Sequence, residues 1–276
     1  MGRYARRLIV VGYLFFLVAW PVALVVHHAL GDADGNLWAQ IRSYDFSAVE
    51  AVLSDAQTRH ALLLTVRIAL ISVVINAVFG ITIGVLLVRY RFPGRRVLNA
   101  VLDLPLSVSP IVVGLSLLLV YSGTRGWLGP TLEDAGLQVI FATPGMVLAT
   151  VFVSLPLVIR EVVPVLHELG IEQEQAAHSL GASGWQTFWR ITLPNMRWAV
   201  VYGVVLTLAR SLGEFGAVKV VSGNLLGRTR TATLVVEEQY LNFDKTGAYA
   251  TAFLLAIVSV ACIVIVGIIR PKHKTP

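Results

Sequence analysis

The sequence predicts an all-α integral membrane protein with six transmembrane helices and both termini in the cytoplasm. Apolar residues make up 56% of the 276 residues and charged residues only 14%, whereas an average soluble domain has roughly 45–50% and about 25%. A soluble domain of this length would need more polar surface, which excludes an ordinary cytosolic enzyme, a disordered chain and a secreted disulfide scaffold. The single cysteine, Cys262, allows neither an internal disulfide nor a CxxC metal site.

Six apolar stretches are long enough to cross a bilayer, because about 20 residues rising about 1.5 Å each span the hydrocarbon core of roughly 30 Å. The first is longer than the apolar part of a signal peptide and no clear cleavage site follows it, so it is interpreted as a retained helix. The stretches are Leu8–Leu30, Ala61–Val88, Val97–Tyr121, Val139–Leu166, Trp198–Val221 and Gly247–Ile269.

Glycines and prolines inside these stretches predict local features of the helices. Gly80 and Gly84 form a GxxxG pattern, which predicts close packing against another helix. The fourth stretch contains Pro144, Pro156 and Pro164, and a kink is expected at each because proline removes a backbone hydrogen bond.

The distribution of Lys and Arg orients the chain. With the N-terminus inside, twelve basic residues lie in inner segments and six in outer segments, and basic residues concentrate on the cytoplasmic side of membrane proteins. The net charge of +6 is therefore explained by membrane orientation, and no nucleic acid partner is expected. In the first outer segment, Ser47 and Glu50 have capping-box spacing and Phe46 is placed to contact Ala51, which predicts a short helix starting there.

The inner loop 167–197 is polar but rich in structural signals. Glu172–Leu180 reads as a short helix with acids in its first turn, and Gly181 follows as a stop. Ser183 and Gln186 form a second capping box, which opens another helix that Pro194 is expected to end. Two interpretations follow from the residues alone: an amphipathic loop on the membrane surface, or a docking surface for a soluble partner.

The same loop resembles the EAA loop of ABC importer permeases. That motif reads Glu-Ala-Ala, three residues, Gly, nine residues, Ile-x-Leu-Pro, and this chain matches its spacing throughout, with Gln175 in the glutamate position and Glu174 just before it. The resemblance implies an ATPase-coupling role, with the polar contact to the ATPase weakened or carried by Glu174. The residues concerned are Glu174, Gln175, Ala176, Ala177, Gly181, Ala182, Ile191, Leu193 and Pro194.

A narrower resemblance covers much of the chain after Thr65. The runs 103–115, 181–195 and 209–223 are similar to the sulfate and thiosulfate permeases, with the W-type subunit the best fit, and parts are shared with molybdate and tungstate permeases. This implies a type I ABC importer fold in a bacterial inner membrane. It also implies a second permease subunit forming a heterodimer, two copies of a cytoplasmic ATPase that uses ATP and Mg²⁺, and an external sulfate-binding protein.

The domain organisation expected from the residues and the resemblance has four parts. They are a cytoplasmic N-terminus with an added first helix (1–30), an outer segment with a short helix (31–60), a five-helix permease core (61–270) and a cytoplasmic tail (271–276).

Charged residues in the apolar stretches need partners or a water-filled path. Arg210 and Glu214 stand four residues apart, so on one helix they would share a face as an ion pair or line an anion path. Asp103 is expected to pair with Arg95 or Arg96. Prolines and serines in the third stretch predict a bend with polar groups. The candidate pathway residues are Ser107, Ser109, Pro110, Arg210, Ser211 and Glu214.

Two other classes remain open at this point. An ion-coupled secondary anion transporter would need carboxylates deep in the bundle, and Glu214 is the one good candidate. A membrane-embedded enzyme would need a catalytic cluster, and neither HExxH nor a Walker A motif occurs in the sequence. We therefore expect no catalytic residue, no metal site and no cofactor bound by this chain, with membrane lipid around it.

Overall fold

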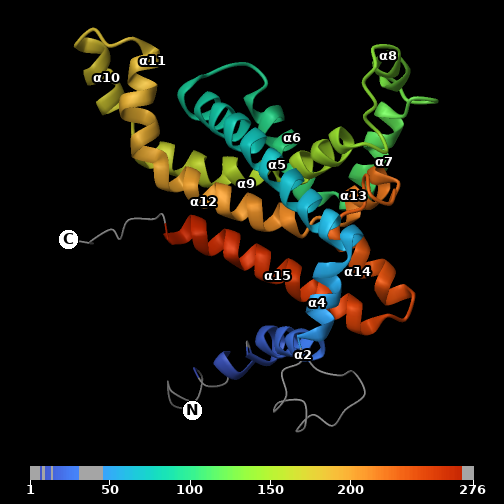
Figure 1. Ribbon diagram of the computed structural model, residues 1–276. Helices are drawn as coiled ribbons and strands as arrows, with labels where there is room; N and C mark the ends of the chain where they lie inside the picture. Colours follow the sequence, from blue (N-terminus) through green and yellow to red (C-terminus); the bar gives the residue numbers. More distant parts are fainter. Residues whose placement is uncertain (1–6, 8–9, 14, 31–45, 269–276) are drawn as a thin grey trace. The chain divides into compact units, whose positions relative to one another are not determined.

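Helices form all the regular structure in the part of the chain that the computed structural model describes, residues 7, 10–13, 15–30 and 46–268 (Figure 1). This confirms the all-α fold class. The predicted tail (271–276) and residues 31–45 lie outside the described residues. The elements are η1 (Phe15–Ala19), α2 (Trp20–Leu30), α4 (Ser47–Ser54), α5 (Ala56–Arg89), α6 (Arg95–Ser107), α7 (Pro110–Tyr121), α8 (Gly129–Asp134), α9 (Thr143–Glu168), α10 (Glu172–Ser179), α11 (Gly184–Thr187), η2 (Phe188–Thr192), α12 (Leu193–Leu212), α13 (Gly216–Ser222), α14 (Ala232–Leu241) and α15 (Lys245–Ile268).

Six membrane spans can be assigned among these helices. Five segments in the described residues are long and apolar enough to cross a membrane, and α6 with α7 makes a sixth if the bent pair is one span. The five are Val10–Leu30, Ala56–Arg89, Thr143–Glu168, Gly184–Leu212 and Lys245–Val264. Each of the six predicted stretches therefore has a counterpart, and the protein is multi-pass.

The chain divides into two compact units. One comprises residues 1–64 and 230–258, and the other comprises residues 65–229 and 259–276. The second unit contains the inner loop and the candidate pathway residues.

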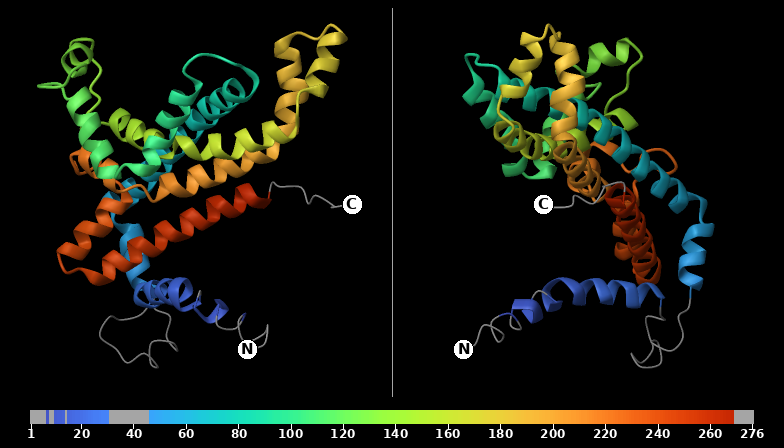
Figure 2. Two further views of the ribbon diagram at one scale, coloured as in Figure 1. Left: turned by 180° about the vertical axis from the view of Figure 1, so that it is seen from behind. Right: turned by 90° about the vertical axis from the view of Figure 1, so that its left-hand side faces the viewer.

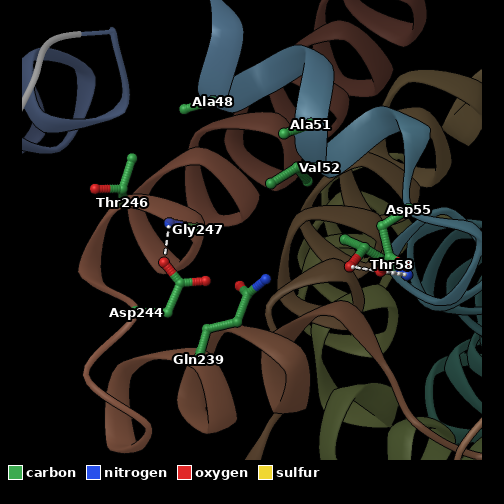
Figure 3. A pocket seen from close by; sticks show the side chains of 9 residues that line it. All are labelled: Ala48, Ala51, Val52, Asp55, Thr58, Gln239, Asp244, Thr246 and Gly247. Carbon is green, nitrogen blue, oxygen red and sulfur yellow. Dashed lines mark hydrogen bonds between the residues drawn. The ribbon is translucent and has the colours of Figure 1, made fainter.

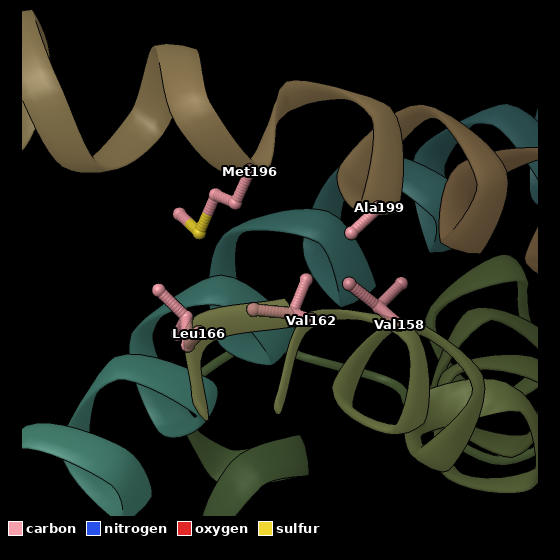
Figure 4. Close-up of a cluster of buried hydrophobic side chains, with 5 residues drawn as sticks. All are labelled: Val158, Val162, Leu166, Met196 and Ala199. Atoms are coloured by element: carbon pink, nitrogen blue, oxygen red, sulfur yellow. The ribbon is translucent and has the colours of Figure 1, made fainter. Parts of the chain in front are cut away.

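The core of the second unit is the pairing of α9 with α12 (Figure 4). Val158, Val162 and Leu166 point from α9 toward Met196 and Ala199 on α12, and the first four of these side chains are fully buried. Burying an aliphatic side chain of this size contributes roughly 1.5–3 kcal/mol where water is the alternative. Inside a membrane the gain comes from close packing instead, because lipid is as apolar as these side chains.

The GxxxG glycines of α5 lie against the same face of α9, as predicted. A Cβ atom at Gly80 would come within 2.7 Å of Val158 Cβ, and one at Gly84 within 2.9 Å of Val162 Cγ1. Beside them, the buried Asn76 side-chain amide donates to Ser154 Oγ at 2.8 Å. The absence of side chains at the two glycines is therefore what lets α5 and α9 approach.

Replacing Gly80 with leucine should lower the thermal stability of the detergent-solubilised protein. The added atoms would overlap Val158, and overpacking typically costs about 1–3 kcal/mol. Thr82→Leu is the matched control, because Thr82 is an exposed residue two positions along the same helix. Equal melting temperatures for the two variants would contradict the packing described here.

Two predicted spans are broken. The third, Val97–Tyr121, consists of α6 and α7 bent by 114°. Ser109 has extended dihedral angles at the break, because a residue before proline is disfavoured in the helical region. Pro110 then opens α7 at its first position. The bend expected from the prolines and serines is confirmed.

The fifth predicted span, Trp198–Val221, is wrong at both ends. The observed span begins earlier, at Gly184, because α11, η2 and α12 follow one another without a break. It ends earlier, at Leu212, the last residue of α12. Gly213 to Phe215 separate it from the short helix α13. The apolar composition continues through this break, which is why hydropathy alone gave the wrong boundaries.

The prolines of α9 behave differently from one another. Pro144 lies in the first turn of the helix, so the expected kink there is wrong. Backbone N–H groups in the first turn of a helix have no partner within the helix, so a proline there removes no hydrogen bond and causes no kink. Pro156 and Pro164 lie inside one continuous helix.

The first unit contains the predicted short helix α4, beginning at Ser47. Val49 and Val52 of α4 pack with Leu30 of α2 and Ala250 of α15. Ser47 is not the N-cap residue that the predicted capping box requires, because Phe46 occupies that position. The Phe46 side chain makes no capping hydrogen bond and is exposed. Burial of Val49 and Val52 therefore stabilises α4.

A cavity of about 330 Å³ lies in this unit beside α4, α14 and the start of α15 (Figure 3). Asp55 and Asp244 are both on its wall, and each caps a helix. Asp55 Oδ2 accepts from the backbone N–H and the hydroxyl of Thr58, at 2.9 and 2.7 Å. Asp244 Oδ1 accepts from Gly247 N–H at 2.9 Å. The hydrogen bonds from Thr58 hold the pKa of Asp55 below its ordinary value of 3.8.

Replacing Asp55 with alanine should destabilise the start of α5 by about 1 kcal/mol at neutral pH, the usual cost of losing an N-cap. Because the folded-state pKa of Asp55 is lowered, its contribution is complete above pH 3.8 and is lost as the pH falls through the folded pKa. The difference in melting temperature from the unsubstituted protein should therefore shrink in acid. Asp134→Ala, at another exposed carboxylate, is the control, and a pH-independent difference for Asp55→Ala would contradict the assignment.

Candidate functional site

The inner loop folds as a helical hairpin that projects beyond the paired ends of α9 and α12 (Figures 1 and 2). Its first helix, α10, begins at Glu172 as predicted and carries Glu172 and Glu174 in its first turn. The second capping box is confirmed. Ser183 Oγ accepts from Gln186 N–H at 3.3 Å, and Gln186 Oε1 accepts from Ser183 N–H at 2.9 Å. The interpretation as a folded loop is therefore confirmed.

Gly181 ends α10 in a left-handed turn, with φ of +85°. Its N–H donates to His178 O at 2.9 Å, and the N–H of Ala182 donates to Ala177 O at 3.0 Å. This pair of bonds is a Schellman motif, which satisfies the last carbonyls of the helix and favours glycine at this position. A Cβ at Gly181 would meet nothing within 4 Å, so the outer side of the turn is open.

Pro194 does not end the second helix, contrary to the prediction. The helix runs from Gly184 to Leu212 and widens to a π-turn at Phe188–Thr192, where Leu193 N–H donates to Phe188 O. Proline has no N–H and its ring clashes with the carbonyl four residues earlier. The widened turn removes that conflict, as such local adjustments do in membrane helices.

The motif residues divide between an open face and an internal one. Gln175, Ala176 and Gly181 are exposed and Ala182 is half-buried, whereas Ala177 is buried. Ile191 and Leu193 are half-buried and Pro194 is exposed. Next to the open face, Leu180 is 89% exposed and Trp185 71% exposed. The sequence placed Leu180 at the end of the predicted helix Glu172–Leu180 and did not mark it as a contact residue. The exposure of an apolar side chain can be recognised only once the fold is known.

Glu174 lies on the internal side. Its carboxylate oxygens Oε1 and Oε2 lie 3.2 and 3.0 Å from Arg89 Nε, at the end of α5, and Oε1 accepts from the Thr192 hydroxyl at 2.8 Å. The Glu174 side chain is only 18% exposed. The geometry therefore favours a role within this chain over the ATPase contact expected for Glu174. Arg89 is one of the twelve inner basic residues that orient the chain, and nothing in the sequence links it to Glu174.

The contacts around Glu174 border an open cavity of about 430 Å³. Its wall is made by the end of α5, by α10 and by the first turns of the helix that starts at Gly184, and it includes Gln175 and His178. Polar contacts of Glu174 therefore join α10 to the end of α5 at the edge of this cavity.

The two broken spans meet near the candidate pathway residues. A Cβ at Gly216 of α13 would lie 3.1 Å from Pro110 Cβ, and one at Gly114 of α7 would lie 2.8 Å from Ala217 O. Ser107 and Ser109 are exposed, and the Ser107 hydroxyl donates to Leu104 O at 3.0 Å. The structure therefore brings Pro110 close to the Gly213–Phe215 break.

Arg210 and Glu214 form an ion pair, with Arg210 Nη1 2.6 Å from Glu214 Oε2. They do not share one helix as predicted, because α12 ends at Leu212. The Glu214 side chain is 2% exposed and that of Arg210 is 38% exposed. Glu214 Oε1 also accepts from Ala217 N–H at 3.0 Å, so the carboxylate ties α12 to the start of α13. Ser211 Oγ is buried with no hydrogen-bond partner among the described residues.

Asp103 pairs across helices, not within its own segment. Arg160 Nη2 on α9 lies 3.0 Å from Asp103 Oδ1, and both side chains are more than half exposed. The expected pairing with Arg95 or Arg96 is therefore wrong. Arg95 and Arg96 lie at the start of α6, and Asp103 lies further along the same helix. Because an α-helix rises about 1.5 Å per residue, the eight residues from Arg95 to Asp103 separate their backbones by about 12 Å along the helix axis.

Several helices long enough to span a membrane, with a folded helical hairpin between α9 and α12, are what a permease, the membrane subunit of a transporter, would need. Residues 76–274 match the family described as binding-protein-dependent transport system inner membrane component, and the chain belongs to this family of the bacterial inner membrane.

Named relatives and solved structures agree with this assignment. The chain is 47% identical to the sulfate transport system permease protein CysW of Synechococcus elongatus, over 86% of this chain and 82% of that protein. It is 50% identical to the protein of the same name in Synechocystis, over 80% and 81%. A bacterial ABC transporter that imports alginate matches with a TM-score of 0.79 at 14% identity, covering 99% and 96%. A structure of the alginate transporter with its substrate-bound periplasmic protein matches with a TM-score of 0.76 at 15% identity, covering 95% and 91%. The type I ABC importer fold is therefore confirmed.

The inner location of the hairpin can be tested by labelling. In a Cys262→Ser background, Ser179→Cys should react with a membrane-impermeant maleimide only after the cells are opened, because basic residues assign this loop to the cytoplasm. Ser179 is exposed and lies outside the Ser183 capping box. Thr131→Cys, exposed in a predicted outer segment, should react in intact cells. The reverse pattern would overturn the orientation.

Proposed function

We propose that this chain is a permease subunit of an ATP-driven importer for sulfate or thiosulfate. The observation that carries the proposal is the identity of 47–50% to permeases named for sulfate transport, over at least 80% of this chain. Within the importer, the chain forms part of the translocation pathway and transmits the work of a separate ATPase.

The open face of the hairpin is the proposed docking surface for that ATPase. Small residues at Ala176 and Gly181 allow another protein to approach closely, and the exposed side chains of Gln175 and Leu180 supply a polar and an apolar contact. ATP and Mg²⁺ belong to the ATPase, since this chain contains no Walker A motif and acts without its own ATP site.

The proposed assembly contains a second permease subunit, two copies of the ATPase and an external binding protein that delivers the anion. The family description supports the binding protein. A heterodimer of permeases and two ATPase copies are part of the proposal through the resemblance to W-type sulfate subunits.

Sulfate import requires such a driver. Moving a dianion inward against about 100 mV costs roughly 4.6 kcal/mol, at about 2.3 per charge. A hundredfold concentration gradient adds about 2.8 kcal/mol. Coupling to an ion gradient is a weaker explanation, because the Glu214 carboxylate is already held by Arg210 and by Ala217 N–H.

The test is transport by the reconstituted importer. Proteoliposomes containing this chain, its partner permease and the ATPase, supplied with the binding protein, should accumulate labelled sulfate only with ATP. Competition with thiosulfate, molybdate and tungstate defines the cargo. Uptake of molybdate in preference to sulfate would overturn the cargo, and uptake without ATP would overturn the class of transporter.

A further inference from the structure

Arg89, the last residue of α5, joins four parts of the second unit. Its Nε contacts the Glu174 carboxylate at 3.0 Å, and its Nη1 donates to Leu166 O, near the end of α9, at 3.1 Å. Glu174 in turn accepts from Thr192 at 2.8 Å. These contacts link α5, α9, α10 and the π-turn, and Arg89, Glu174 and Thr192 are called here the hairpin clamp.

The two charged side chains of the hairpin clamp are mostly covered by protein, although they border the open cavity. The Arg89 side chain is 12% exposed and that of Glu174 is 18% exposed. A second cross-helix pair among the described residues of this unit, Arg160 with Asp103, is 58% and 59% exposed. Exposed ion pairs contribute little because water and salt screen them, whereas removing one partner of a buried pair leaves an uncompensated charge. Loss of the Arg89–Glu174 pair should therefore have a larger effect than loss of the Arg160–Asp103 pair.

Few other contacts hold α10 in place. Ala177 is the one buried residue of this helix. The Asn195 side chain on α12 donates an exposed hydrogen bond to Gln173 Oε1 on α10, at 2.7 Å. The turn at Gly181 also connects α10 to the helix that starts at Gly184. The clamp is what connects α10 to α5 as well.

We propose that Arg89 is a positioning residue for energy coupling. Through Glu174 it makes the hairpin move together with α5, so that force applied by the ATPase at Gln175 and Gly181 reaches two spans, α5 and α12. This rests on the proposed function, because it assigns Arg89 a task within ATP-driven import.

The test separates the strength of coupling from assembly. Arg89→Gln and Glu174→Gln should leave the permease bound to its ATPase while the sulfate transported per ATP hydrolysed falls by about tenfold, the effect of losing one interaction of modest strength. Arg89→Lys, which keeps the charge, should restore part of the ratio. The double variant should be no worse than either single variant, because both remove the same contact. Arg160→Gln, at the exposed pair, is the matched control and should keep the normal ratio.

A second readout does not depend on transport. Amide hydrogen exchange in Glu172–Ser179 should be faster in Arg89→Gln and Glu174→Gln than in the unsubstituted complex, and unchanged in Arg160→Gln. Unchanged exchange and an unchanged sulfate-to-ATP ratio would overturn the proposal, as would uptake that falls only in proportion to the amount of assembled complex. Failure of the unsubstituted complex to import sulfate, with exchange still accelerated in the variants, would instead overturn the proposed function.

Discussion

Replacing Gly181 with arginine should abolish sulfate uptake while the subunit still inserts into the membrane. Two effects combine at this position. The backbone there has φ of +85°, which costs a residue with a Cβ roughly 1–2 kcal/mol. The turn is also open to the outside, with no atom within 4 Å of the place where a Cβ would lie, so the long side chain projects into the space that the ATPase would occupy.

Two further variants separate these effects. Gly94→Arg is the matched control, since Gly94 has φ of +89°, equally open surroundings and a place outside the hairpin. Gly181→Asn tests the backbone alone, because asparagine tolerates the left-handed region. Uptake and ATPase co-purification should be lost for Gly181→Arg and largely kept for the other two. Normal uptake by Gly181→Arg at normal abundance would show that this turn is not the docking surface.

Removing the charge of Arg210 should reduce the amount of assembled complex more than removing that of Glu214. Arg210→Gln removes the guanidinium that lies against a carboxylate only 2% exposed, and losing one partner of a buried pair typically costs about 3–5 kcal/mol. In Glu214→Gln, the remaining Arg210 side chain is 38% exposed and can turn toward water, and the glutamine can still accept from Ala217 N–H. The double variant should recover part of the loss.

The alternative role for Arg210, as a group that guides the anion, has a different signature. Uptake would then fall at unchanged abundance in Arg210→Gln, and the double variant would not rescue it. Abundance in the membrane and sulfate uptake, measured together for the two single variants and the double variant, distinguish these outcomes. Arg228→Gln, at an exposed arginine, is the control. Wild-type behaviour of both single variants would contradict both roles.

The local signals in the hairpin were readable from the sequence because the interactions they describe are local. The Ser183 capping box joins residues three apart, and the Gly181 turn is closed by bonds spanning three and five residues. Hydropathy likewise located six spans, since crossing a bilayer is a matter of length and composition. At α4 the same signals were less exact, since they placed the N-cap at Ser47 and the structure has it at Phe46.

A multi-pass membrane protein with a folded hairpin loop could be predicted from the amino-acid sequence, because composition, helix length and short-range hydrogen bonding depend on neighbouring residues. The packed helices were needed to show that Glu174 turns inward to Arg89, 85 residues away, that Asp103 pairs with Arg160, and that α12 ends before Glu214. Such pairings depend on how helices are rotated and packed against one another, and spacing along one helix carries no information about the charges that a neighbouring helix presents to it.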